Sequence, residues 1–113
     1  MGVITRVAGT GAQGNSGDDG PATEAELAFP FGVAVTADGG FLIADSVNSV
    51  VRKVSSAGVI TRVAGSGTPG NSGDDGTATA AKLNGPFGVA ETPDGGFLIA
   101  DSGNNEVRKV VLA

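Results

Sequence analysis

The sequence contains no cysteine and no histidine among its 113 residues. Without cysteine there is no disulfide framework, thiolate metal site or thiol nucleophile. Without histidine the commonest zinc or copper ligand and the commonest general base at neutral pH are missing. Tryptophan and tyrosine are absent too, and aromatic residues make up only 4% of the chain. We therefore expect a protein that is not an enzyme and that uses no cofactor and no metal.

Positive charge is scarce as well. Seven Lys and Arg residues stand against twelve Asp and Glu, a formal net charge of −5. Nucleic acid and anionic membrane surfaces require a basic face, so we expect neither as a partner. No apolar run approaches the roughly 20 residues that span a bilayer, and the N-terminus lacks a signal-peptide pattern, which leaves the cellular location unknown. Repeat sequence follows Met1 directly, which suggests an excised or engineered fragment.

What the sequence does contain is glycine, 20 residues of it, between runs rich in Val, Ala, Ile and Leu. This composition suits short strands joined by turns. The dominant feature is a repeat, because Gly2–Ala57 aligns with Gly58–Ala113 without a gap and about three-quarters of the positions match. Such repetition is the mark of an array of similar structural units. We predict two units, residues 2–57 and 58–113.

Each copy is built around one hairpin. The first reads PFGVAVTADGGFLIADS over Pro30–Ser46, and the second reads PFGVAETPDGGFLIADS over Pro86–Ser102. Two alternating apolar runs that flank Asp-Gly-Gly indicate a tight β-hairpin. Flanking β-branched runs extend the pattern, so that the strands expected in the first copy are Val3–Ala8, Phe31–Thr36, Phe41–Ala44 and Val50–Val54.

A long loop separates the first of these strands from the hairpin. It runs from Gly9 to about Ala28 and is rich in Gly, Asn, Ser and Asp. Within it, Pro21–Ala28 predicts a short helical turn. A four-stranded antiparallel unit with apolar residues on both faces, repeated head to tail, is typical of a β-propeller blade. A β-sandwich is the alternative, but a sandwich does not require near-identical halves.

The segments PFGVAVTADGGFLIADSVNSVVRKV and PFGVAETPDGGFLIADSGNNEVRKV resemble NHL repeats, which form six-bladed β-propellers. The stretch GDDGPATEAEL is similar to the long-loop version of the repeat found in bacterial proteins. The resemblance implies that Phe31–Thr36 is the innermost strand, with Phe41–Ala44 second and Val50–Val54 third. It also implies that the outermost strand of the blade is Val59–Ala64, at the start of the second copy.

This strand order leaves the second blade incomplete, because Glu106–Val110 is a third strand with no fourth strand after it. An unpaired strand edge invites another strand, and Val3–Ala8 of a neighbouring chain is the obvious donor. We expect this strand exchange to close a ring. The family preference implies six blades and a homotrimer; a homotetramer with eight blades is the runner-up. The residues expected to pair between chains are Val3, Ile4, Thr5, Arg6, Val7, Val107, Arg108, Lys109 and Val110.

Two polar motifs could be taken for ligand sites. The oxygen-rich runs Asn15–Gly20 and Asn71–Gly76 suggest a cation, but their spacing does not match an EF-hand. We interpret them as Asx turns that fold the loop. Asp45 and Asn48, with their copies Asp101 and Asn104, are interpreted as structural turn residues. We expect their side chains to bond to backbone amides and the asparagines to tolerate a positive φ.

The paired cations Arg52-Lys53 and Arg108-Lys109 are interpreted as structural too, with the arginine packed between blades against a carboxylate. Glu91, which replaces Val35 of the first copy, has no explanation in the sequence. We conclude that the sequence predicts an all-β, non-catalytic, self-assembling propeller scaffold with two blades per chain. The alternative is a module that binds a protein or a glycan through its long loops, although the Trp and Tyr that usually anchor such sites are missing.

Overall fold

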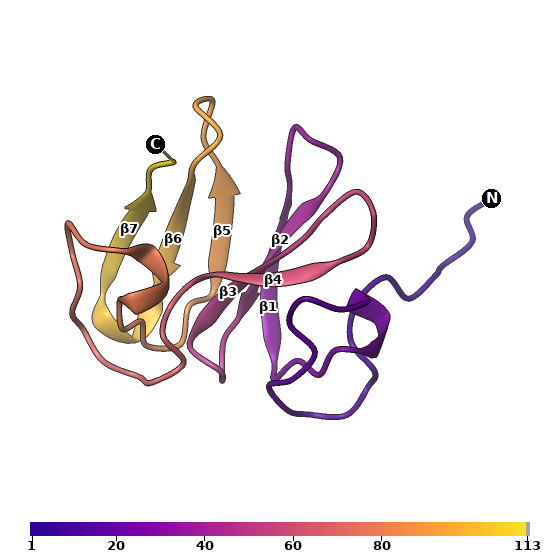
Figure 1. Cartoon of the computed structure of the whole chain (residues 1–113), viewed down its shortest axis with the longest axis horizontal. Helices are drawn as coiled ribbons and strands as arrows, with labels where there is room; N and C mark the ends of the chain where they lie inside the picture. The colour runs from indigo at the N-terminus through magenta and orange to yellow at the C-terminus, as the bar shows by residue number, and fades with distance from the viewer. Residues whose placement is uncertain (113) are drawn as a thin grey trace.

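The computed structural model describes residues 1–112, which form two antiparallel sheets standing side by side (Figure 1). The first sheet has four strands in the order β1-β2-β3-β4. Each strand pairs with the strand before it, which is the arrangement of a propeller blade. The strands are β1 (Pro30–Val35), β2 (Phe41–Asp45), β3 (Val50–Val54) and β4 (Ile60–Ala64).

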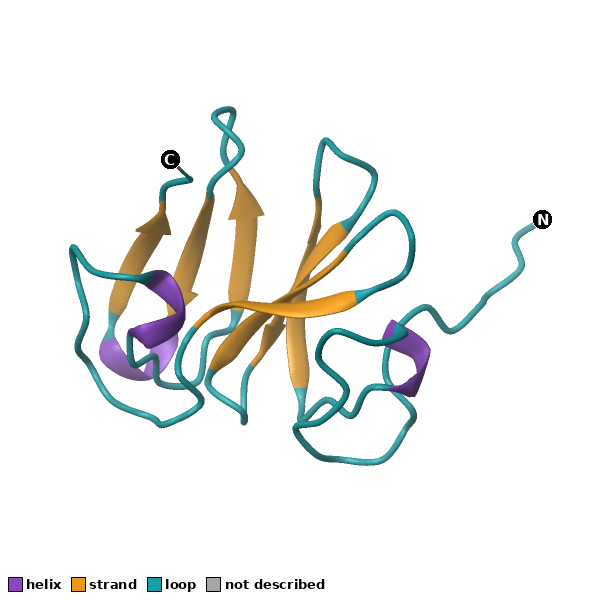
Figure 2. Cartoon of the chain, viewed as in Figure 1, coloured by secondary structure: helices purple, strands orange, loops and turns teal. Residues whose placement is uncertain are grey.

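The second sheet has three strands in the order β5-β6-β7. They are β5 (Gly88–Glu91), β6 (Phe97–Asp101) and β7 (Glu106–Val110). The third of these has the bounds expected from the sequence. The all-β, blade-type architecture predicted from the repeat is thus confirmed, including the sheet that lacks a fourth strand. In Figure 2 β7 lies at the outer edge of this sheet, with no strand beyond it.

The hairpin turns set the register of the inner strands. In the first blade, the Thr36 hydroxyl donates a hydrogen bond to Asp38 Oδ1 (2.5 Å), and the Gly40 amide donates to the same oxygen (3.2 Å). Gly39 has a φ of 92°, a left-handed conformation that favours glycine. This Asx-type turn places Val35 opposite Phe41. The Asp-Gly-Gly signal therefore fixes which strand residues face the neighbouring blade.

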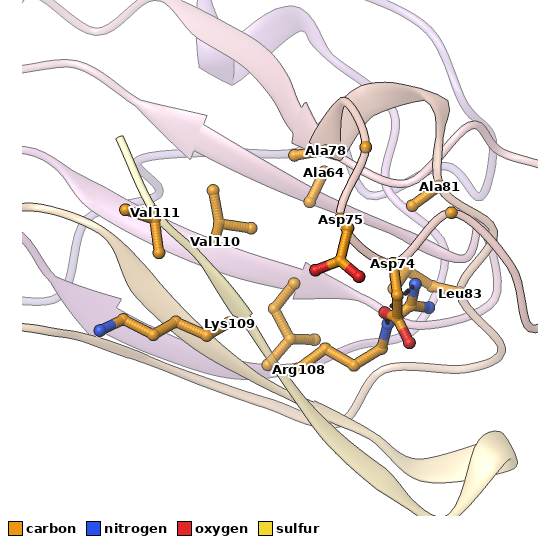
Figure 3. Close-up of a pocket in the computed structure, with 13 residues that line it drawn as sticks. Ala64, Asp74, Asp75, Ala78, Ala81, Leu83, Arg108, Lys109, Val110 and Val111 are labelled. Atoms are coloured by element: carbon orange, nitrogen blue, oxygen red, sulfur yellow. Dashed lines mark hydrogen bonds and ion pairs between the residues drawn. The ribbon is translucent and has the colours of Figure 1, made fainter. Parts of the chain in front are cut away.

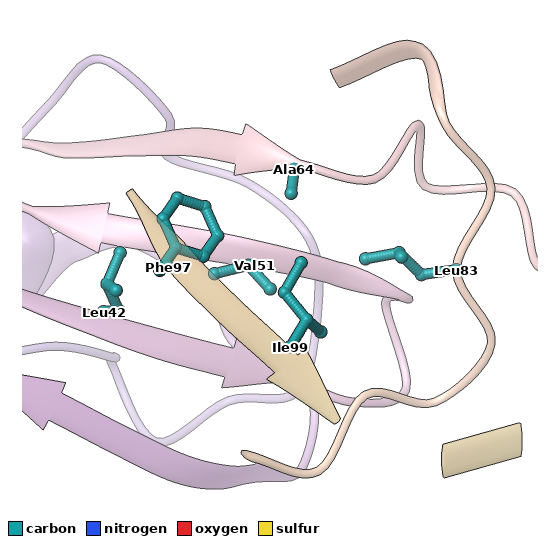
Figure 4. Packing of buried hydrophobic residues seen from close by; sticks show 6 residues of the cluster. All are labelled: Leu42, Val51, Ala64, Leu83, Phe97 and Ile99. Atoms are coloured by element: carbon teal, nitrogen blue, oxygen red, sulfur yellow. The ribbon is translucent and has the colours of Figure 1, made fainter. Parts of the chain in front are cut away.

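The main core lies between the two blades (Figure 4). Leu42, Val51 and Ala64 of the first blade pack against three apolar residues of the second repeat, Leu83, Phe97 and Ile99. A blade cannot bury this face by itself, because the partner side chains belong to the next blade along the chain.

A second cluster lies in the first blade. Ile60 of β4 is buried there against Ile43 and Val54 and against Ala22 and Ala25 of the long loop. The predicted helical turn in that loop is a short 3-10 helix, η1 (Ala22–Glu24). Its copy is η2 (Ala78–Ala80), and a third, η3 (Ser102–Asn104), follows β6. Of the helices in residues 1–112, none is long and apolar enough to cross a membrane.

The strand predicted at Val3–Ala8 is wrong for the single chain. These residues form no strand and trail away from the first sheet, as the indigo N-terminal segment of Figure 1 shows. The copy of this segment forms β4, where it pairs with β3. Among residues 1–112 Val3–Ala8 pairs with no strand, and a segment without a strand partner leaves its backbone groups to water.

Candidate assembly interface

A buried arginine ties the long loop of the first repeat to its blade. Arg52 lies on β3, is fully buried and donates hydrogen bonds from all three guanidinium nitrogens. Its Nη1 lies 3.3 Å from Asp45 Oδ2 and its Nη2 lies 3.0 Å from Asp18 Oδ1. The same guanidinium donates to the backbone oxygens of Ser16 and Glu26. The fixed fork of the guanidinium suits this many acceptors, and a lysine could not replace it.

The predicted turn residues complete this network. Asp45 Oδ1 accepts the Ala28 amide (2.8 Å), and Asn48 Nδ2 donates to Asp45 Oδ2 and to the Gly14 carbonyl (both 2.8 Å). The expectation of a positive φ at Asn48 and Asn104 is wrong, because the left-handed residues are the next ones, Ser49 (φ 53°) and Asn105 (φ 58°). The asparagine side chain is occupied by its two hydrogen bonds, and the residue after it turns the chain. In the second repeat Asp101, Asn104 and Arg108 make the equivalent contacts.

Replacing Arg52 by methionine is expected to lower the free energy of unfolding by roughly 3–5 kcal/mol, because the buried Asp45 carboxylate loses its cationic partner. The matched control is Lys53→Met on the same strand. Lys53 pairs with Asp38 at 2.5 Å on the surface, where solvent screening leaves an ion pair with little effect on stability. Urea unfolding of both variants at one protein concentration measures the difference. Equal losses for the two variants contradict a structural role specific to Arg52.

The acidic residues of the loop Asn15–Gly20 contact other parts of the first blade. Asp18 is engaged by Arg52, and the Asp19 amide donates to the Ile60 carbonyl (2.7 Å). Within the described residues no group of three or more acidic, histidine or cysteine side chains is placed to hold a metal ion. On the surface, the hydrogen bond from Lys53, with further bonds from Thr36 and Gly40, lowers the pKa of Asp38 to about 2.

The feature that singles out the second blade is a cavity of about 350 Å³ beside β7 (Figure 3). Its lining includes Ala78, Ala81, Ile99 and Val110. Position n of the first repeat corresponds to position n + 56 of the second, so these four residues are the copies of Ala22, Ala25, Ile43 and Val54. In the first blade those copies enclose Ile60. The cavity is therefore the place that Ile60 fills in the first blade, and we call it the Ile socket.

The residue that corresponds to Ile60 is Ile4, which is 99% exposed, whereas Ile60 is 0% exposed. In the first blade the backbone also receives this strand: the Ile60 amide donates to the Gly20 carbonyl (3.0 Å), and the Ala22 amide donates to the Gly58 carbonyl (2.8 Å). The matching groups of Gly76 and Ala78 belong to residues that line the socket. The second blade thus offers both an apolar pocket and hydrogen-bonding groups to a strand like residues 3–8.

The first repeat carries a second opening. A cavity of about 460 Å³ lies by Gly9, Leu27 and Phe29. Their copies are Gly65, Leu83 and Gly85. A Cβ added to Gly65 would lie 2.4 Å from the Ser49 carbonyl oxygen, and Leu83 packs against Val51. Gly65 and Leu83 are thus covered by β3 and by the turn before it. The second cavity lies at the matching residues of the first repeat, where no such strand of residues 1–112 covers them.

Beside this cavity the first blade presents an open apolar face. Phe31, Val33 and Val35 of β1 are all exposed. Their copies Phe87, Val89 and Glu91 lie just before and within β5, the strand that contacts β1. The rings of Phe31 and Phe87 meet there edge to face with centroids 4.1 Å apart. Exposed apolar side chains gathered on one face indicate an interaction surface.

Glu91 now has a clear position. Its carboxylate oxygen Oε1 accepts a hydrogen bond from the Ala37 amide (2.8 Å) across the junction of the two blades. Sequence reasoning missed this contact, because the partner is 54 residues away and the pattern of β5 alone does not reveal it. Of the residues predicted to pair between chains, those of β7 lie on the open edge and Val3–Val7 lie in the exposed N-terminal segment.

Residues 4–71, more than half of the chain, match the family model of the teneurin NHL domain. Over 97 residues the chain is 34% identical to the chloroplastic protein SUPPRESSOR OF QUENCHING 1 of Arabidopsis thaliana. That alignment covers 84% of this chain but only 9% of the plant protein.

Among solved structures, a protein of unknown function from Bacteroides thetaiotaomicron superposes with a TM-score of 0.77 and 33% identity over 90% of this chain. An auxiliary nutrient binding protein from the same species shares the fold, with a TM-score of 0.68 and 24% identity over 91% of the chain. The chain spans 26% and 27% of those two proteins. The solved relatives are thus about four times as long as the part that this chain matches.

Proposed function

This chain belongs to the NHL family of β-propeller repeats, and we propose from that premise that it is a non-catalytic scaffold that builds a closed propeller from copies of itself. A binding or scaffold module is what the NHL-type fold supports in general. The finer proposal is a homotrimer of six blades, in which each copy donates residues 3–8 to the second blade of its neighbour.

The observation that carries the proposal is the Ile socket. Its lining repeats, residue for residue, the surroundings of Ile60, and the only copy of Ile60 in the sequence is Ile4. By the register of β3 and β4, Ile4 would pair with Val110, Thr5 with Lys109 and Arg6 with Arg108. A donated strand satisfies the open edge of β7 and fills the cavity in one step.

The second observation concerns the exposed face of the first blade, formed by Phe31, Val33 and Val35 of β1. Its copy in the second blade lies in and just before β5, the strand that contacts β1 inside the chain. A head-to-tail contact of one kind, repeated by rotation, closes a ring when the rotation permits. Six blades are the family's preferred number, which requires three copies with two blades each. Each copy contributes one donated strand and receives one.

The experiment is the native mass of the purified 113-residue chain over a dilution series, by native mass spectrometry or light scattering. A mass of three chains is expected, with dissociation only at high dilution. A mass of four chains keeps the ring and overturns the six-blade count. A folded chain that stays monomeric at high concentration overturns the proposal, because the socket and the open face would then have no occupant.

A further inference from the structure

The two repeats differ at only 15 of their 56 aligned positions, and several of these differences meet at the junction between blades. Inside the chain, Glu91 accepts the Ala37 amide at 2.8 Å. The first repeat carries Val35 where the second has Glu91, and the second carries Pro93 where the first has Ala37. Both members of the contact are therefore exchanged together.

This paired exchange has a chemical reason. Proline has no amide hydrogen, so a glutamate at position 35 of the next copy would find no donor on Pro93. A valine at that position needs none. Val35 is 83% exposed in the single chain, and contact with the Pro93 ring of a preceding copy would remove apolar surface of both residues from water. The Val35 and Pro93 pair thus suits a junction that the single chain does not contain.

A second exchange lies at the same junction. The Gly85 amide donates to Ser49 Oγ (3.3 Å) between the two blades. The corresponding residues of the other junction are Phe29 and Asn105. Phe29 is 59% exposed and has a φ of 54°, close to the 61° of Gly85. A bulky residue with a left-handed backbone is strained, and glycine, which the second repeat carries at this position, would avoid that strain.

On these grounds we infer that the junction between copies is a distinct, more apolar interface than the junction inside the chain. In it, Val35 and Phe29 of one copy lie against Pro93 and Asn105 of the preceding copy. The inference rests on the proposed self-assembly and specifies its contacts. The physical reason for two kinds of junction is that separate copies must offset the loss of translational and rotational freedom on binding, which blades joined by a chain do not lose. One difference makes the second blade more polar instead: Glu106 stands where the first repeat has Val50, and the contacts of the single chain do not explain it.

A double-mutant cycle tests the Val35 contact. Val35→Glu is expected to raise the concentration for half-assembly by at least about tenfold, because the new carboxylate is removed from water without a donor. Pro93→Ala alone is expected to change it by less than about threefold. The double variant V35E/P93A recreates the Glu91 and Ala37 pair between copies and is expected to recover most of the loss.

The outcomes separate this inference from the proposed function. A wild-type chain that assembles, with V35E equal to wild type or with V35E/P93A as weak as V35E, overturns the inferred contact and leaves the scaffold standing. A wild-type chain that never assembles overturns both. In this cycle, coupling between positions 35 and 93 that appears in assembly and not in the stability of the unassembled chain supports the inference.

Phe29→Gly provides an independent test on the second pair. Glycine removes the left-handed strain, so the thermal stability of the unassembled chain, measured at high dilution, is expected to stay the same or rise. Assembly is expected to weaken by about tenfold, because an exposed aromatic anchor of the interface is lost. An unchanged assembly constant overturns the assignment of Phe29 to the junction.

Discussion

Replacing Ile4 by aspartate is expected to abolish assembly at micromolar concentrations. The Ile socket is lined by the apolar residues Ala78, Ala81, Ile99 and Val110 and by the charged residues Asp74, Asp75, Arg108 and Lys109. Both cations already pair with carboxylates of the chain, so an added carboxylate would lose its hydration and compete for these partners, a penalty of several kcal/mol at each junction. Native mass spectrometry should show single chains, or aggregated material, under conditions where the wild type is expected to form the closed ring.

The control for Ile4→Asp is the same charge one residue away. Val3 corresponds to Val59, which stays 39% exposed in the complete blade. Val3→Asp should therefore assemble nearly as well as the wild type, although both variants add one negative charge to the same segment. If the two variants weaken assembly equally, the effect comes from net charge, and the assignment of Ile4 to the socket is wrong.

Replacing Gly88 by alanine is expected to block the junction between copies while leaving the inside of the chain undisturbed. A Cβ on Gly32, the copy of Gly88, would lie 2.6 Å from the Phe87 carbonyl oxygen and 2.9 Å from Gly88 Cα. The Cβ of an alanine at position 88 meets nothing closer than Ala100 Cβ at 3.9 Å. Within the described residues no close contact requires glycine at position 88, whereas the proposed neighbouring copy would require it.

In a ring, Gly88 would face the Phe31 carbonyl of the next copy as closely as Gly32 faces Phe87. An added methyl group then forces the two inner strands apart, at about 1–3 kcal/mol for each junction. Gly20→Ala is the control, because its Cβ would meet only the Gly17 carbonyl oxygen at an ordinary 3.5 Å. We expect Gly88→Ala to lose the oligomer on dilution and Gly20→Ala to keep it. Circular dichroism of both variants verifies that their strands still form.

Local signals in the sequence were sufficient to predict most of the strands. The Asp-Gly-Gly turns and the alternating apolar runs predicted both hairpins, and Val50–Val54 and Glu106–Val110 have the bounds that the sequence indicated. Periodicity and turn chemistry act over a few residues, so they can be read without knowing the partner of each strand. For Val3–Ala8 the same local signals predicted a strand that the single chain does not form. Its pattern is that of β4, but a strand also needs a neighbour.

The contacts of the candidate site were less predictable. A carboxylate partner for Arg52 was expected, but the loop acceptors that surround its guanidinium were not. The Glu91 hydrogen bond to Ala37 was missed altogether. Both contacts join segments that the chain brings together only after the blade or the blade pair has formed. Nothing in the local pattern of β3 or β5 distinguishes a buried polar residue with partners from an exposed one.

The amino-acid pattern alone was enough to identify a duplicated blade of the NHL type, since strand pattern, turns and repeat are all local or periodic properties. The three-dimensional arrangement was needed to find the surfaces that the two blades leave exposed. It showed a cavity that matches the environment of Ile60, an exposed Ile4 that corresponds to it, and paired differences between the copies at the junction of blades. The physical reason is that blade packing is set by side chains from different repeats, and their complementarity exists only when the blades stand against one another.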